Sequence, residues 1–177
     1  MGAQLVSREN SRLLPLAILP VEQIKAINYE MPMASAQVKS AILLAGMYAD
    51  SKTIVTEPYV SRDHTEKMFE TFGVELYKEG TSVGIQKVEQ LISPETLEVP
   101  GDISSAAFWL VAASIIPNSN LTLKNVGVNK TRTGIIDVLL NMGADIKVVN
   151  ERMSGKEPMA DLIVKSAKLK GTSFGAE

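Results

Sequence analysis

The chain repeats one phrase three times at an interval of about seventy residues, and this repeat constrains the fold more than any other feature. A large apolar residue, a glycine and a strand-like segment follow one another at Met1-Gly2, Phe72-Gly73 and Met142-Gly143. The three glycines are separated by 71 and then 70 residues. Such a period predicts a fold assembled from copies of one supersecondary unit.

Two further landmarks follow the same interval. Arg62 and Arg132 each lie eleven residues before the glycine of their own copy, and segment 35–41 lies seventy residues before the similar segment 105–111. Helix–glycine–strand junctions resemble one another in many proteins, but that likeness does not explain a shared spacing. We therefore expect these segments to occupy equivalent places in successive units.

Within each unit the pattern predicts a strand, a helix, a strand, a second helix and two final strands. The first helices are apolar almost all round, which indicates burial on most sides, whereas the second helices are amphipathic. A glycine in the left-handed conformation is expected to end each second helix. The expected helices are at 35–48, 63–72, 105–116 and 133–142, and the expected strands at 53–55, 74–78, 83–87, 121–123, 145–150 and 160–166.

The fold class is therefore α/β (α+β), built of βαβαββ units. The chain is interpreted as the tail of one unit (about 1–25), one complete unit (about 26–98) and most of another (about 99–177). Because it starts and stops within the pattern, we expect it to be a piece of a longer protein.

Composition excludes several classes of function. The 18 basic and 20 acidic residues give no basic excess for nucleic acid or an anionic membrane. The absence of cysteine excludes disulfide scaffolds, thiolate metal sites and cysteine nucleophiles. The start lacks a signal-peptide pattern, and no apolar run reaches about eighteen residues, so we expect a soluble, cytoplasmic protein.

Several catalytic motifs are also missing. The chain has one histidine, His64, and neither of the two common glycine-rich phosphate loops nor a nucleophile elbow. His64 stands at a helix start and is interpreted as a partly exposed structural residue. The sequence therefore predicts no metal site.

The beginnings of the first and second helices of the complete unit are the candidate site. Ser35 is interpreted as a helix N-cap, and the free N–H groups of a helix start also attract phosphate or carboxylate. Gln37 and Lys39 are polar residues in a mostly apolar helix, and Arg62 precedes the second helix. Either Ser35 is only a cap and Arg62 only a salt-bridge residue, or both segments face one cleft that binds an anion.

Four segments together resemble the 5-enolpyruvylshikimate-3-phosphate synthase family, in the bacterial class that carries Ala-Ser-Ala-Gln. They are 32–41, 61–68, 99–106 and 129–135. The resemblance implies an inside-out barrel, incomplete here, from a fold of two domains with three units each, helices inside and sheets outside. It further implies that 1–98 is the end of the lower, shikimate-phosphate-binding domain and that 99–177 is the first unit of the upper one.

The resemblance also implies an activity, a step of chorismate and aromatic amino-acid biosynthesis. The enolpyruvyl group of phosphoenolpyruvate passes to the 5-hydroxyl of shikimate 3-phosphate, and phosphate leaves, with no metal or organic cofactor. By the resemblance, Ser35, Ala36, Gln37 and Arg62 bind shikimate 3-phosphate, and Gln37 also lies near phosphoenolpyruvate. Asp102 is interpreted as a helix N-cap, so no catalytic residue is assigned in this chain.

The family's acid/base and lysine–glutamate motifs do not occur in this sequence. We therefore expect the isolated chain to lack turnover. We also expect the isolated chain to self-associate through apolar faces, and the intact enzyme to be a monomer. Two alternatives remain open at this point. One is a relative of the enzyme that loads enolpyruvate onto UDP-N-acetylglucosamine, and the other is a non-catalytic repeat module.

Overall fold

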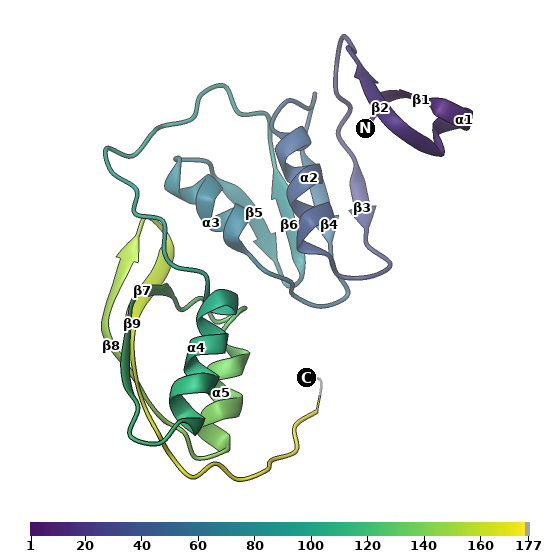
Figure 1. Ribbon diagram of the computed structural model, residues 1–177. Coiled ribbons are helices and arrows are strands. Elements are labelled where there is room, and N and C mark those ends of the chain that lie inside the picture. Colours follow the sequence, from purple (N-terminus) through teal and green to yellow (C-terminus); the bar gives the residue numbers. More distant parts are fainter. Residues whose placement is uncertain (176–177) are drawn as a thin grey trace. The chain divides into compact units, whose positions relative to one another are not determined.

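The computed structural model describes residues 1–175. Contacts along the chain divide it into two compact units, Met1–Ser93 and Pro94–Glu177. In both units helices pack against one face of a sheet (Figure 1), which confirms the mixed α/β class. The sheets of the described residues are open and none closes into a barrel, as expected of an incomplete copy of the fold.

The main sheet of the first unit has the order β3-β4-β6-β5, with β3 parallel to β4 and the other pairs antiparallel. Helices α2 and α3 contact this sheet (Figure 1). The element order matches the predicted unit. Its members are β3 (Asn28–Glu30), α2 (Ala36–Gly46), β4 (Thr53–Thr56), α3 (His64–Thr71), β5 (Leu76–Glu79) and β6 (Ser82–Ile85).

The core of this unit lies between α2, α3 and the sheet. It includes Leu43, Val55, Phe69 and Ile85, all at most 5% exposed. Gly46 is the last residue of α2, and a Cβ added there would lie 2.7 Å from the Cγ2 of Ile85. A glycine at this place therefore lets the end of α2 approach the sheet closely.

The first residues form a separate hairpin, the tail of a unit that the repeat predicted. Strand β1 (Gln4–Ser7) pairs antiparallel with β2 (Leu13–Leu19), and α1 (Arg8–Ser11) connects them. Glu9 and Asn10 have positive φ, so α1 is a tight turn rather than a regular helix. Apolar side chains on β2 remain exposed, Leu14 and Ile18 among them.

The second unit repeats the plan in five elements, and its antiparallel sheet has the order β7-β9-β8. Its core includes Leu110, Val126, Leu139 and Leu162. A parallel bridge from Gly101 to Val126 stands where the first unit has β3. The elements are α4 (Ile103–Ile115), β7 (Asn120–Gly127), α5 (Gly134–Asn141), β8 (Asp145–Ser154) and β9 (Glu157–Lys165).

The backbone geometry confirms the threefold repeat of the glycine motif. All three repeated glycines have positive φ, at 84°, 78° and 90°. In each copy the residue before the glycine accepts a backbone hydrogen bond from the segment that follows the last strand. These bonds run from Lys25 to Met1 (3.0 Å), from Ile92 to Phe72 (2.9 Å) and from Lys170 to Met142 (2.8 Å).

The expected register of the first helices is wrong by three residues. Their N-caps are Ser35 and Asp102, 67 residues apart, whereas the second helices begin at His64 and Gly134, 70 residues apart. Ser105 is therefore not the counterpart of Ser35. The second unit has its additional residues after the first helix, where β7 is longer than β4 and contains a bulge between Leu123 and Val126.

Asp102 is a helix N-cap, as predicted. Its side chain accepts a hydrogen bond from the Ser104 N–H at 3.1 Å. This bond is the main cause that lowers the pKa of Asp102, and the nearby Arg132 charge acts in the same direction.

The expectation that the first helices are buried on most sides is wrong for these units. Phe108 and Trp109 on α4 are 78% and 61% exposed, and Leu44 on α2 is 52% exposed. The reason is that each unit offers its first helix only one sheet to pack against. None of the helices in residues 1–175 is long and apolar enough to span a membrane.

A buried ion cluster lies inside the first unit. Lys39 on α2 is 1% exposed, and its Nζ lies 2.7 Å from Glu57 Oε2 and 2.7 Å from Glu66 Oε1. Glu57 follows β4 and Glu66 lies in the first turn of α3, so one ammonium group joins three elements. Isolated buried charges are costly, and the two carboxylates therefore need this cation.

We predict that Lys39→Met destabilises the chain strongly. The substitution keeps the side-chain length but leaves two buried carboxylates without a cation, a loss that costs about 3–5 kcal/mol. Urea denaturation followed by circular dichroism near neutral pH measures the change in the free energy of unfolding. A loss similar to that of an exposed pair, such as Lys78 with Glu70, would contradict the prediction.

The same cluster predicts a dependence of stability on alkaline pH. Burial lowers the pKa of Lys39, but the hydrogen bonds and charges of Glu57 and Glu66 outweigh burial and hold it above the ordinary 10.5. Because the folded-state pKa is raised, the ion cluster contributes fully below pH 10.5, and its contribution falls as the pH rises through the higher folded-state value. The stability difference between wild type and Lys39→Met should therefore shrink only above that pH in urea titrations.

We predict that Gly143→Ala lowers the stability of the second unit by about 1–2 kcal/mol, because alanine is strained at positive φ. The nearest atom to a Cβ there is 3.8 Å away, so no clash contributes. Gly134→Ala is the matched control, since Gly134 starts α5 with open space around it and without a positive φ. Equal melting temperatures for the two variants would contradict the prediction.

Candidate functional site

The beginnings of α2 and α3 line one open cavity of about 400 Å³ in the first unit. The two segments that the sequence singled out therefore do face one cleft. Of the four predicted site residues, the cavity brings together Ala36, Gln37 and Arg62. The complete lining is Ala36, Gln37, Ser40, Ala41, Leu44, Arg62, His64 and Thr65.

Ser35 precedes this cavity and is the N-cap of α2. Its Oγ accepts a hydrogen bond from the Val38 N–H at 3.4 Å and lies 3.5 Å from Gln37 Oε1. The first turn of α2 contains no acidic residue, so nothing there neutralises the partial positive charge of the helix start. This end of the cavity favours an anion or a polar oxygen.

Arg62 lies on the other side of the cavity, just before α3. Within residues 1–175 no carboxylate pairs with its guanidinium, although the side chain is half-buried. Arg132, its counterpart in the repeat, differs because its Nη2 lies 3.1 Å from Asp102 Oδ1 and contacts Ser104. The salt-bridge interpretation thus fits Arg132, whereas Arg62 keeps its charge available to the cavity.

Three polar residues of the lining were not assigned a binding role from the sequence. Ser40 and Thr65 share a hydrogen bond of 2.6 Å that joins α2 to α3, and the exposed His64 lies beside them in the lining. Helical periodicity was the signal that could have found Ser40, because Ser40 lies three residues after Gln37 and four residues before Leu44.

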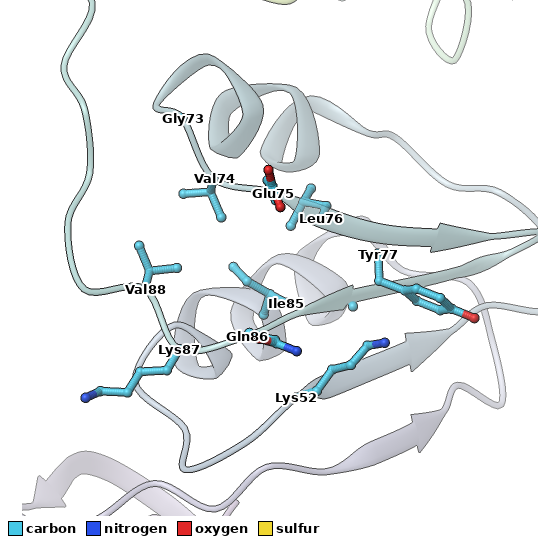
Figure 2. A pocket seen from close by; sticks show the side chains of 11 residues that line it. Lys52, Gly73, Val74, Glu75, Leu76, Tyr77, Ile85, Gln86, Lys87 and Val88 are labelled. Atoms are coloured by element: carbon cyan, nitrogen blue, oxygen red, sulfur yellow. The ribbon is translucent and has the colours of Figure 1, made fainter.

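A second cavity of about 500 Å³ lies elsewhere in the first unit, between β5 and the segment after β6 (Figure 2). It contains none of the predicted site residues. Its lysines are already engaged, because Lys52 Nζ lies 3.8 Å from the Tyr77 ring centroid and Lys87 pairs with Glu89 at 2.7 Å. The chemistry of anion binding therefore favours the cavity at Arg62.

The described residues contain no group of three or more histidine, cysteine, aspartate or glutamate side chains placed to hold a metal ion. The groups that the candidate site offers are a guanidinium, an amide, hydroxyls and the backbone N–H groups of a helix start. Such groups bind and orient a phosphorylated, hydroxyl-bearing molecule.

Comparison with known proteins agrees with the fold and the motifs. The family model for EPSP synthase (3-phosphoshikimate 1-carboxyvinyltransferase) matches residues 1–174. The 3-phosphoshikimate 1-carboxyvinyltransferases of Crocosphaera subtropica and Bacillus subtilis are 53% and 49% identical to this chain. These matches cover 99% and 100% of the chain but only 39% and 41% of the relatives.

Solved structures give the same result. A structure of EPSP synthase from Acinetobacter baumannii superposes with a TM-score of 0.86 at 47% identity, covering 97% of this chain and 39% of that one. The chain thus spans about two fifths of the length of its relatives. On the family model, the sequence identity and the superposed fold, this chain belongs to the EPSP synthase (3-phosphoshikimate 1-carboxyvinyltransferase) family.

Proposed function

We propose that this chain contributes part of the shikimate 3-phosphate site of an enolpyruvyl transferase. The whole enzyme would transfer the enolpyruvyl group of phosphoenolpyruvate to the 5-hydroxyl of shikimate 3-phosphate and release phosphate. The names of the relatives support this reaction, and the chain corresponds to about two fifths of their length. In this proposal residues 1–98 end the lower domain and residues 99–177 begin the upper one.

The observation that carries the proposal is the guanidinium of Arg62, which lines the same cavity as Gln37 and has no carboxylate partner within residues 1–175. A guanidinium has a planar fork of donors that matches a phosphate group. Arg62 therefore binds the phosphate of shikimate 3-phosphate in this proposal. The start of α2 adds backbone N–H groups and a favourable dipole on the opposite side.

The remaining residues orient the hydroxyl-bearing ring of shikimate 3-phosphate. Ser35 and Gln37 provide hydroxyl and amide groups that match the hydroxyls and carboxylate of the ligand. Ala36 lies between them and adds little bulk, which leaves room beside the helix backbone. Gln37 also extends toward phosphoenolpyruvate in this proposal. Fixing the acceptor hydroxyl in this way contributes to the rate through orientation.

A titration of shikimate 3-phosphate into the isotope-labelled chain tests the proposal. We expect amide shifts to concentrate at residues 35–41 and 61–65, and Arg62→Ala to weaken binding about tenfold or more, because hydrogen bonds to charged groups are among the stronger ones. Arg132→Ala is the matched control, since Arg132 is the repeat counterpart that is already paired.

Two results would contradict the proposal. One is a set of shifts that lies outside the cavity lining, around Lys52 and Tyr77 for example. The other is an affinity for shikimate 3-phosphate that is the same in wild type and Arg62→Ala. Inorganic phosphate titrated in parallel separates recognition of the whole ligand from recognition of its phosphate alone.

A further inference from the structure

The carboxylate of Glu57 is shared between the buried cation and the segment that carries Arg62. Its Oε2 lies 2.7 Å from Lys39 Nζ and accepts the Ser61 N–H at 3.4 Å, while its Oε1 accepts the Ser61 hydroxyl. The Glu57 backbone is fixed as well, because its N–H donates to Thr81 O at 3.1 Å. Glu57 therefore connects the interior of α2 with the residue that precedes Arg62.

Apart from Glu57, the segment between β4 and α3 is held at its far end, where Asp63 O accepts the Lys67 N–H at 3.0 Å and the Asp63 carboxylate pairs with Lys67. Residues 57–63 belong to no helix or strand, and Pro58, Tyr59 and Val60 are exposed. Arg62 is therefore held between two anchored neighbours, Ser61 through Glu57 and Asp63 through Lys67. On the far side of Arg62, the start of α3 is held through Glu66, which contacts the same Lys39 Nζ at 2.7 Å.

The second unit shows that the fold itself does not need this ion cluster. From the shared N-caps, the counterpart of Lys39 is Ala106, and from the shared second helices the counterpart of Glu66 is Ile136. Ala106 and Ile136 are buried in an apolar core. Two apolar residues thus occupy the equivalent place in the second unit, which has no unpaired arginine to hold. Buried ion pairs are in general a weak source of stability.

We propose that Lys39 is a positioning residue for the anion site. It anchors Glu57 and Glu66, and through the contacts of Glu57 with Ser61 it holds Arg62 in the cavity opposite Gln37. Lys39 does not touch the ligand, since it is 1% exposed and does not line the cavity. The identity of the ligand rests on the proposed function, but the mechanical role of Lys39 does not.

Two measurements on the isotope-labelled chain test this role. The first is amide hydrogen exchange at Ser61 in wild type, Lys39→Met and Glu57→Gln. We expect exchange at the Ser61 amide, whose N–H donates to Glu57 Oε2, to accelerate about tenfold relative to the amides of β4 and β6, as loss of a charge-assisted hydrogen bond would produce. The second is the affinity for shikimate 3-phosphate, which we expect to fall about tenfold in Lys39→Met.

Val74→Ala is the control for stability alone. Val74 is buried in the hydrophobic core between α2, α3 and the sheet, and it does not line the cavity at Arg62. It should accelerate exchange throughout the unit and leave the affinity of the folded protein unchanged. If Lys39→Met does not fold, Glu57→Gln decides whether the link to Ser61 positions Arg62. The glutamine keeps one oxygen that accepts hydrogen bonds, and an amide N–H₂ group replaces the second oxygen.

The outcomes separate the two proposals. Unchanged exchange at Ser61, or exchange that rises only as much as in Val74→Ala, would overturn the positioning role. Faster exchange with an unchanged affinity for shikimate 3-phosphate would overturn the role of Lys39 in ligand binding. If wild type does not bind shikimate 3-phosphate, the proposed function fails in this chain, and the exchange data still decide whether Lys39 holds the Arg62 segment.

Discussion

One ammonium group between two buried carboxylates joins three elements beside the candidate site of the first unit. Lys39 joins α2, the residue after β4 and the first turn of α3 through contacts of 2.7 Å to both carboxylates. The cavity lined by Gln37 and Arg62 lies where α2 and α3 begin, and these are two of the elements that Lys39 joins. Because a buried charge is tolerated only with good partners, the three elements are held at a defined separation rather than merely close together.

The second unit achieves the same plan by other means. Its first and second helices pack through apolar residues, and the repeat counterpart of Arg62 is neutralised by Asp102. The two units therefore share element order, glycine geometry and helix capping, yet only the first presents an unpaired guanidinium within the described residues. The fold is thus a common framework, and the proposed anion chemistry lies in the few positions where the two copies differ.

The sequence predicted the architecture because its signals were local. Gly73 and Gly143 end helices at positive φ, and Ser35 caps α2, as glycine and serine do in most proteins. The cap of α4 at Asp102 was predicted, but the seventy-residue register of this helix was wrong, because added residues after the helix restored the spacing of later landmarks. The burial of Lys39 could not be predicted. Lysine is usually exposed, and the partners of Lys39 lie on other elements.

The contact network of the site lies within one continuous stretch, from the Ser35 cap to Glu66 in the first turn of α3. All the links among Lys39, Glu57, Ser61 and Glu66 are therefore made within the first unit. Contacts of short sequence separation form early and quickly in folding. During synthesis on the ribosome, this half-site would take shape as soon as its own unit has emerged, before the residues that follow it in the chain have been added.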